Sequence, residues 1–514
     1  MRFTSMPSSI GEVISRSAKR WGAKTALIIG EQSWSFDELD SESSHVAQAL
    51  VDHGIQRGDR VSLYAANCAE WIITYYGILK AGAVANPLNL MLTAEEAVFA
   101  MNDCGAKAVF GSADRIEGLV NVDLPPALGL RVAFGAVAPA GAWTFDGFKH
   151  RRGRDRDPSF PVADVSLDDV STIGYTSGTT GSPKGAVLTH RAILMNAAMT
   201  STMHVRNADD VVASALPCSH VYGNIVMNST IACGGTLVLH RTFNTAQMLG
   251  SIARHRCTMF EGVPTMSMYM LADPALAEAD RSSLTRCTVG GQTMPEAKMH
   301  AVEAAIGCPL IELWGMTELG GLGTTHSAYG PRRLGSIGVP LPHLQARIAS
   351  GATGKGELPA GEVGELQIRG PVVMKEYLGR PEATKEAMTE DGWLRTGDLA
   401  RMDSEGYIYV VDRLKDMIIT GGFNVYPAEL ERVIAQHPAI AMVAVAGVPD
   451  PVKGELANAF VVLKPDHPVN ASELERYCRE RLAAYKVPRA FRFVADLPQT
   501  SSGKILRREL RKAG

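Results

Sequence analysis

The segment 175–185 concentrates residue types that bind anions. Its sequence is YTSGTTGSPKG, and ten of its eleven residues are Gly, Ser, Thr, Pro or Lys. Glycines let backbone N–H groups approach an anion closely, hydroxyl groups add donors, and Lys184 adds a positive charge. Pro183 stands where a Walker A loop has its last glycine, and Gly185 follows the lysine in place of Ser or Thr. The composition therefore predicts a polyphosphate-binding loop of another kind, although such a segment alone is equally typical of a surface loop.

Five further segments carry polar residues at turns or in apolar surroundings. A carboxylate such as that of Glu318 suits a hard cation bound to phosphates, and Asp398 can accept hydrogen bonds from two vicinal hydroxyl groups. Taken singly, these residues also fit structural roles: His220 as a core histidine, Glu318 as a surface charge, Asp398 as a turn residue and Lys504 as one cation of a basic tail. The five segments are 216–223 (LPCSHVYG), 290–292 (GGQ), 312–318 (ELWGMTE), 392–399 (GWLRTGDL) and 497–505 (LPQTSSGKI).

Together, and in this order, the segments resemble the signatures of the adenylate-forming superfamily. This superfamily includes acyl- and aryl-CoA synthetases, luciferases and the adenylation domains of peptide synthetases. The resemblance covers nearly the whole chain and implies an AMP-forming acid–thiol ligase. Such an enzyme activates a carboxylic acid with ATP as an acyl-adenylate and then transfers the acyl group to coenzyme A. The implied cofactors and co-substrates are ATP, Mg²⁺ and coenzyme A.

The resemblance also implies roles for individual residues. The catalytic residues are Lys504, Thr317, Glu318 and His220. The metal site consists of Glu318 and Thr176. The ATP-binding residues are Thr176, Ser177, Gly178, Thr179, Thr180, Gly181, Lys184, Gly291, Gln292, Trp314, Gly315, Met316, Thr317, Asp398 and Arg413. The acyl pocket comprises His220, Val221, Tyr222, Gly290, Gly315 and Gly320. The residues that bind coenzyme A are Gly421, Gly422, Tyr485, Lys486 and Arg489.

Two of these assignments have a specific consequence. Trp314 stands where the superfamily more often has Tyr, so stacking on adenine should persist while the hydrogen bond of a phenol is lost. Lys504 is expected in the active site only during adenylation, after which the C-terminal domain turns about a hinge at Lys415.

The elements that must hold these residues alternate along the chain. Residues 61–64 and 107–110 form strand-like apolar runs on either side of a helical pattern over 70–80. Such alternation predicts an α/β fold, with mixed or parallel sheets covered by helices. From Gly356 onwards, short strands separated by Gly and Pro predict a small β-barrel-like unit.

A charged break at 412–416 precedes a compact α+β pattern of ~100 residues, which is within the size range of a domain. We therefore predict an ATP- and acid-binding N-terminal domain over 1–413, a hinge near 414–415 and a small mobile C-terminal domain over 416–514. In that last domain, Pro427 opens a predicted helix, and Asn470 with Glu473 forms a predicted capping box.

The composition excludes several classes of partner. The 514 residues carry a formal net charge of −3, so nothing indicates binding to nucleic acid. The eight cysteines form no CxxC pair, which favours free thiols in a reducing compartment. Residues 1–22 do not resemble a secretory signal, and no long apolar run predicts a membrane span. We expect a cytoplasmic enzyme with small-molecule partners and no integral membrane contact, and the resemblance adds a homodimer.

The identity of the acid is less strongly indicated. Small residues over 319–323 are compatible with a roomy tunnel, and no Arg or Lys lies in 221–224, 260–264 or 290–294, which disfavours a dicarboxylate. A medium- or long-chain fatty acid is the first expectation, and an aromatic or phenylpropanoid acid is the second. Glu261 has no place in this interpretation. Two alternatives are an enzyme that loads a separate carrier protein and a catalytically silent binding protein.

Overall fold

The structure is a computed structural model that describes residues 7–150, 160–176, 183–292, 294–350, 356–414, 416–420, 423–450, 453–465, 467–499 and 505–512. It confirms the α/β class, with four sheets in this part of the chain. None of the helices described combines the length and apolar character that a membrane crossing requires.

The first large sheet contains eight strands within the described residues, in the order β19-β9-β8-β4-β3-β5-β6-β7. Strands β3 to β7 are parallel, whereas β8 and β9 form an antiparallel hairpin. The predicted strands at 61–64 and 107–110 lie within β3 and β5. The strands are β3 (Arg60–Tyr64), β4 (Val84–Pro87), β5 (Ala106–Ser112), β6 (Leu130–Phe134), β7 (Trp143–Thr144), β8 (Val170–Thr176), β9 (Lys184–Thr189) and β19 (Glu376–Tyr377).

The second large sheet contains nine strands in the described chain, in the order β16-β15-β14-β13-β12-β10-β11-β1-β2. Because β10 to β14 run parallel, their carboxyl ends lie at one edge, where open α/β sheets bind ligands. The strands are β1 (Thr25–Ile29), β2 (Gln32–Ser35), β10 (Val211–Ser214), β11 (Thr236–Leu239), β12 (Met259–Gly262), β13 (Arg286–Gly290), β14 (Leu310–Met316), β15 (Gly321–Thr325) and β16 (Val339–Pro340).

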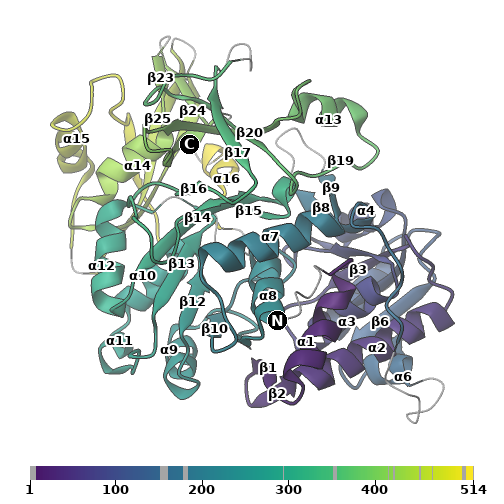
Figure 1. Ribbon diagram of the computed structural model, residues 1–514. Coiled ribbons are helices and arrows are strands. Elements are labelled where there is room, and N and C mark those ends of the chain that lie inside the picture. Colours follow the sequence, from purple (N-terminus) through teal and green to yellow (C-terminus); the bar gives the residue numbers. More distant parts are fainter. Residues whose placement is uncertain are drawn as a thin grey trace.

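Several helices lie between the two large sheets. Helix α3 is buried along nearly its whole length and packs against α2, as expected for a helix that is apolar on every side. Helices α7 and α8 occupy the middle of the molecule (Figure 1) and pack against each other. These helices are α2 (Phe36–Asp52), α3 (Ala69–Lys80), α7 (His190–Met203) and α8 (Val221–Cys233).

The predicted small β unit is a four-stranded antiparallel sheet in the described residues, in the order β17-β18-β20-β21. It shares the apolar core of the large sheets, since Leu366 and Ala400 belong to that core. The strands are β17 (Gln345–Ala349), β18 (Gly364–Arg369), β20 (Leu394–Met402) and β21 (Ile408–Arg413).

The C-terminal sheet lies at the top of Figure 1 and has its own core around Leu430, Val445 and Val461. Asn470 and Glu473 form the predicted capping box at the start of α15. Asp412 of β21 accepts a hydrogen bond at 2.8 Å from the backbone N–H of Ala428 in α14, which joins this unit to the preceding sheet. The position of the hinge stays a prediction, because Lys415 lies outside the described residues. The elements are β22 (Ile418–Thr420), β23 (Phe423–Val425), β24 (Ile440–Asp450), β25 (Gly454–Leu463), β26 (Ala490–Phe493), α14 (Pro427–Ala435), α15 (Ala471–Arg479) and α16 (Arg507–Lys512).

Candidate active site

The β8–β9 hairpin places the two ends of the predicted phosphate loop side by side. Thr176 ends β8, Lys184 begins β9, and the two residues are partners in the antiparallel register. The hydroxyl group of Thr176 lies 3.5 Å from the carbonyl oxygen of Lys184 and donates to it. The predicted loop residues Ser177, Gly178, Thr179, Thr180 and Gly181 lie outside the described residues.

The hairpin packs closely against the short helix η2 (Thr317–Leu319), which follows β14. A Cβ atom on Gly174 would lie 2.8 Å from Cγ2 of Thr317, a distance that a side chain could not tolerate. Gly174 therefore permits the approach that brings Thr317 and Glu318 to the base of the predicted phosphate loop. The predicted metal ligands, Thr176 and Glu318, thus come from neighbouring elements.

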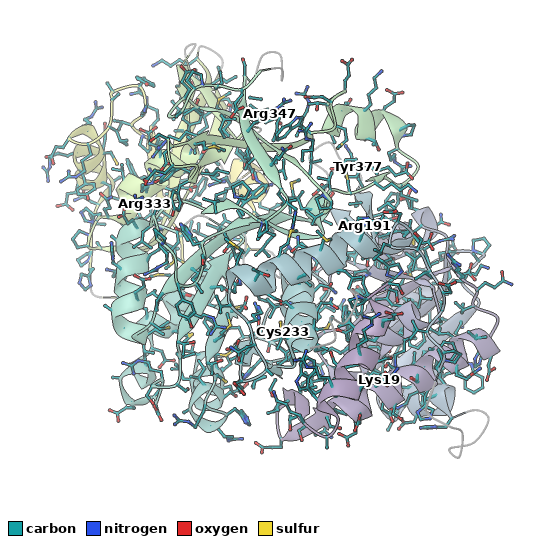
Figure 2. All side chains as sticks on the ribbon, in the orientation of Figure 1. Lys19, Arg191, Cys233, Arg333, Arg347 and Tyr377 are labelled. Carbon is teal, nitrogen blue, oxygen red and sulfur yellow. The ribbon has the colours of Figure 1, made fainter. Side chains whose placement is uncertain are left out.

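Tyr377 contacts two of the predicted site residues. Its hydroxyl group donates a 2.7 Å hydrogen bond to the buried carboxylate of Glu318, and the ammonium group of Lys184 lies 5.2 Å from the centre of its ring. Burial, together with the nearby charge of Glu318, raises the pKa of the Tyr377 phenol. Figure 2 labels Tyr377 on the green segment that carries β19. Sequence reasoning missed this residue, since nothing in the local pattern distinguishes it from an ordinary strand aromatic.

The donor set around Glu318 fits a magnesium ion bound to phosphates. Among the ion pairs of the described residues, none gives Glu318 a cationic partner. No cluster of three or more His, Cys, Asp or Glu residues that could hold a metal occurs in the same part of the chain. An ion at this position would take a carboxylate oxygen of Glu318 and the hydroxyl of Thr176, and it would complete its shell with oxygens of phosphate and water, as Mg²⁺ prefers.

Trp314 and Asp398 are joined directly. The indole N–H of Trp314 donates a 2.7 Å hydrogen bond to one carboxylate oxygen of Asp398, and Nε of Arg413 lies 3.2 Å from the other oxygen. Asp398 and Arg413 are register partners on β20 and β21. The predicted loss of the hydrogen bond of a phenol at this position stays a prediction, and the structure shows that the indole N–H of Trp314 makes a hydrogen bond of its own.

Gly291, Gln292, Gly315 and Met316 lie where the parallel strands end. Gly291 follows β13 with φ of +90°, a backbone conformation that favours glycine, and it places Gln292 beyond the sheet edge. A Cβ atom on Gly315 would lie 2.1 Å from the carbonyl oxygen of Gly321, so only glycine fits between β14 and β15. Met316 ends β14 directly before Thr317.

The predicted acyl-pocket residues surround the start of α8. His220 caps this helix, because its Nδ1 accepts a 3.2 Å hydrogen bond from the N–H of Tyr222. Val221 is the first residue of the helix, and the buried Tyr222 donates from its hydroxyl group to Thr288 on β13 at 2.7 Å. Gly290 ends β13.

The glycines of the predicted tunnel lie close to neighbouring side chains. A Cβ atom on Gly320 would lie 2.9 Å from Cδ1 of Ile193, and one on Gly321 would lie 2.4 Å from Cγ1 of Ile225. A Cβ atom on Gly323 would lie 2.6 Å from the ring of Trp314. In the direction in which a Cβ atom would point, these glycines are therefore packed against neighbouring residues, and the roomy tunnel stays a prediction.

The C-terminal motif is only partly described. Lys504, Lys415, Gly421 and Gly422 lie outside the described residues. Of the predicted coenzyme A residues, Tyr485 and Arg489 are exposed, whereas the ammonium group of Lys486 is paired with Glu429 at 2.7 Å.

Within 505–512, residues that follow Lys504 are tied to the C-terminal unit. Arg507 is paired with Glu431 at 2.7 Å and with Asp416 at 3.4 Å, and Leu510 is buried. Gln499 and Ile505, which lie within the motif on either side of Lys504, form an antiparallel bridge. The alternative interpretation of this segment as a solvated tail is wrong for the described residues.

Glu312, in the motif that contains Trp314, is a buried carboxyl group without a cationic partner among the described residues. It accepts one hydrogen bond, from the N–H of Gly335 at 2.8 Å. Burial raises the pKa of Glu312 to about 8.

Comparison with known proteins agrees with this geometry. The AMP-binding enzyme family matches residues 14–378, and the AMP-binding enzyme C-terminal domain matches residues 429–504. The chain is similar to a long-chain-fatty-acid–CoA ligase of Bacillus subtilis (strain 168), with 35% identity over 98% of this chain and 94% of that protein. It is 37% identical to a feruloyl-CoA synthase of Amycolatopsis sp, over 97% of each chain. The crystal structure of the anthranilate CoA ligase AuaEII with anthranoyl-AMP has a TM-score of 0.91 at 28% identity, covering 99% of this chain and 98% of that one.

Proposed function

Since the chain belongs to the AMP-binding enzyme family, in its acyl-CoA synthetase branch, we propose that it joins a carboxylic acid to coenzyme A at the expense of ATP, with AMP and pyrophosphate as products. The observation that carries the proposal is the meeting of three groups from three different sheets around the end of β14. These are the ends of the phosphate loop at Thr176 and Lys184, the buried carboxylate of Glu318, and the hydrogen-bonded pair of Trp314 and Asp398.

In the first half-reaction the acid carboxylate attacks the α-phosphorus of ATP. A bond forms between the carboxylate oxygen and phosphorus, the bond to the bridging oxygen breaks, and pyrophosphate leaves. Because charge spreads over the phosphate oxygens in the transition state, positioning and cations supply most of the catalysis. We assign the triphosphate to 176–184 and the bridging and carboxylate oxygens to Lys504. A magnesium ion held by Glu318 and Thr176 would supply charge neutralisation at the phosphates.

Nucleotide recognition falls to the Trp314–Asp398 pair. The indole ring offers a face for adenine, and the carboxylate of Asp398 offers acceptors for the two ribose hydroxyl groups. Arg413, half-exposed beside the same carboxylate, adds a positive charge next to the ribose. Gly291 and Gln292 border the adenine, and Thr317 contacts the α-phosphate.

In the second half-reaction the thiol of coenzyme A attacks the acyl carbon of the adenylate. The new thioester bond forms as the bond between the acyl carbon and the phosphate oxygen breaks, and AMP leaves. We propose that the C-terminal domain turns about Lys415 between the two steps, which withdraws Lys504 and brings Gly421 and Gly422 to the acyl-adenylate. Tyr485 and Arg489 offer an exposed aromatic ring and charge for the nucleotide of coenzyme A.

The proposal is tested by separating the half-reactions. Lys504→Ala should slow ATP–pyrophosphate exchange on the order of 10²–10³-fold, because one positioned cation is removed. The same variant should still form thioester from supplied acyl-adenylate. Lys453→Ala, which removes an exposed lysine elsewhere in the C-terminal unit, serves as the control and should keep both rates.

Equal loss of both steps in Lys504→Ala would contradict the assignment of Lys504. Absence of exchange by the wild-type protein with every acid would contradict the function itself. Exchange without thioester formation from coenzyme A would instead indicate a carrier protein as the acceptor. The homodimer and the cytoplasmic location stay predictions.

A further inference from the structure

Glu261 on β12 is a buried charge for which the proposed chemistry has no use. The residue is 0% exposed, and its carboxylate is paired with the guanidinium group of Arg206, whose side chain is 1% exposed. Arg206 lies just after α7 and is 55 residues distant in sequence. An ion pair so deeply buried costs desolvation energy, so its surroundings must be polar enough to hold it.

The surroundings form a continuous hydrogen-bonded network. Thr288 of β13 donates to the second carboxylate oxygen of Glu261 at 2.8 Å, and because a carboxylate only accepts, the Thr288 hydroxyl is left to accept from the hydroxyl of Tyr222 at 2.7 Å. Arg206 also donates to the hydroxyl of Thr230 on α8 at 3.1 Å. The network thus ties α8 to two strands of the nine-stranded sheet.

This network lies directly inward from the predicted acyl site. Tyr222 is the second residue of α8 after its capping His220, and Thr288 is two residues before Gly290 on β13. Two residues of strand span roughly 7 Å. Glu261 is the register partner of Thr288 on the neighbouring strand, so both lie at the same depth.

The glycines near the site are closely packed in the direction in which a Cβ atom would point. As described above, the glycines of β15 and the preceding turn are packed against Ile193, Ile225 and Trp314. The polar network therefore lies in the path of an acid that extends inward past the first turn of α8. A long alkyl chain extending inward would have to separate Glu261 from Arg206 and leave two buried charges unpaired, which is strongly unfavourable.

We infer that the Tyr222–Thr288–Glu261–Arg206 network forms the inner end of the acyl site, and that the enzyme activates a compact acid, with an aromatic ring or a short chain, in preference to a long-chain fatty acid. This inference rests on the proposed function. In this inference Tyr222 contacts the end of the bound acid that is farthest from the carboxylate. Glu261 and Arg206 hold Tyr222 in place through Thr288.

The first experiment is a panel of acids with the full-length wild-type enzyme. Benzoate, cinnamate, hexanoate and hexadecanoate are compared by kcat/KM in pyrophosphate release with coenzyme A present. We expect kcat/KM for the best compact acid to exceed kcat/KM for hexadecanoate on the order of 100-fold, because the site does not accommodate the long chain. A kcat/KM for hexadecanoate equal to or above that of every compact acid would overturn the inference while supporting the proposed function. Failure of all acids would overturn the proposed function.

The second experiment lengthens the acyl site by removing the side chain of Tyr222. Tyr222→Ala removes the ring and should raise the ratio of kcat/KM for decanoate to kcat/KM for hexanoate about 10-fold, within the range for added methylenes in an apolar site. The matched control is Tyr269→Ala, at an exposed tyrosine on α10 (Pro264–Ala272), which should leave the ratio unchanged. An unchanged ratio in a folded Tyr222→Ala enzyme would overturn the inference, since a general loss of stability lowers both rates without changing their ratio. If Tyr222→Ala does not fold, the comparison of acids with the wild-type enzyme alone tests the inference.

Discussion

The hydrogen bond between Trp314 and Asp398 offers the sharpest test of nucleotide recognition. Trp314→Phe keeps an aromatic face for adenine and removes the N–H group that lies 2.7 Å from the carboxylate. A hydrogen bond to a charged group contributes about 1.5–3 kcal/mol. Trp314 is half-buried, and Arg413 remains 3.2 Å from the other carboxylate oxygen, so water and Arg413 compensate in part. We therefore expect an effect at the lower end of the range, about 1.5 kcal/mol, on the positioning of Asp398 for the ribose, which corresponds to about a 10-fold rise in the KM for ATP.

The assay is ATP–pyrophosphate exchange at saturating acid with varied ATP. The KM for the acid and the maximal rate should change by less than about 2-fold, because the lost contact serves ground state and transition state alike. Trp393→Phe is the matched control, since its ring packs between Arg347 and Arg369, 4.4 and 4.7 Å from the guanidinium carbons, and not against Asp398. An unchanged KM for ATP in Trp314→Phe, or an equal rise in the KM for the acid, would refute this reasoning.

Two further predictions concern buried carboxyl groups. Tyr377→Phe removes the 2.7 Å hydrogen bond that orients Glu318, so the Mg²⁺ concentration for half-maximal exchange should rise about 10-fold; an unchanged magnesium titration would contradict this. Glu312 has a pKa of about 8, compared with an ordinary value of 4.5. Between these two pH values the folded protein therefore binds more protons than the unfolded chain. The free energy of unfolding consequently falls as pH rises through this window, by up to about 1.4 kcal/mol per pH unit. Glu312→Gln keeps an acceptor for the N–H of Gly335 and removes the pH-dependent fall in stability. The melting temperature of the variant should therefore match that of the wild type near pH 4 and exceed it at pH 8. A difference in melting temperature that is independent of pH would contradict the raised pKa of Glu312.

Features encoded locally were predicted well from the sequence. The strands at 61–64 and 107–110, the helix over 70–80 and the capping box at Asn470 each depend on apolar spacing or on a side chain three residues away. The motif residues Glu318 and Asp398 were predicted as site residues for a related reason, because short segments around them carry a recognisable order of residue types.

Contacts between distant segments were not predictable in this way. Tyr377 lies 59 residues from Glu318, and Arg206 lies 55 residues from Glu261, so no local pattern links the members of either pair. The packing of neighbours against Gly321 was missed for the same reason, since a glycine in a sequence does not reveal which side chain fills its place. Only the folded arrangement of strands identifies such partners.

The anchoring of the C-terminus by Arg507 has a kinetic consequence. Its ion pairs with Glu431 and Asp416 tie the chain just after Lys504 to the start of the C-terminal unit, and the bridge between Gln499 and Ile505 closes the motif on itself. The described flanks of Lys504 are consequently fixed to the C-terminal unit and would move with it in the proposed rotation. The entropy of ordering these flanks is lost once, when the protein folds, so the rotation that we propose about Lys415 would not have to order them again in each catalytic cycle.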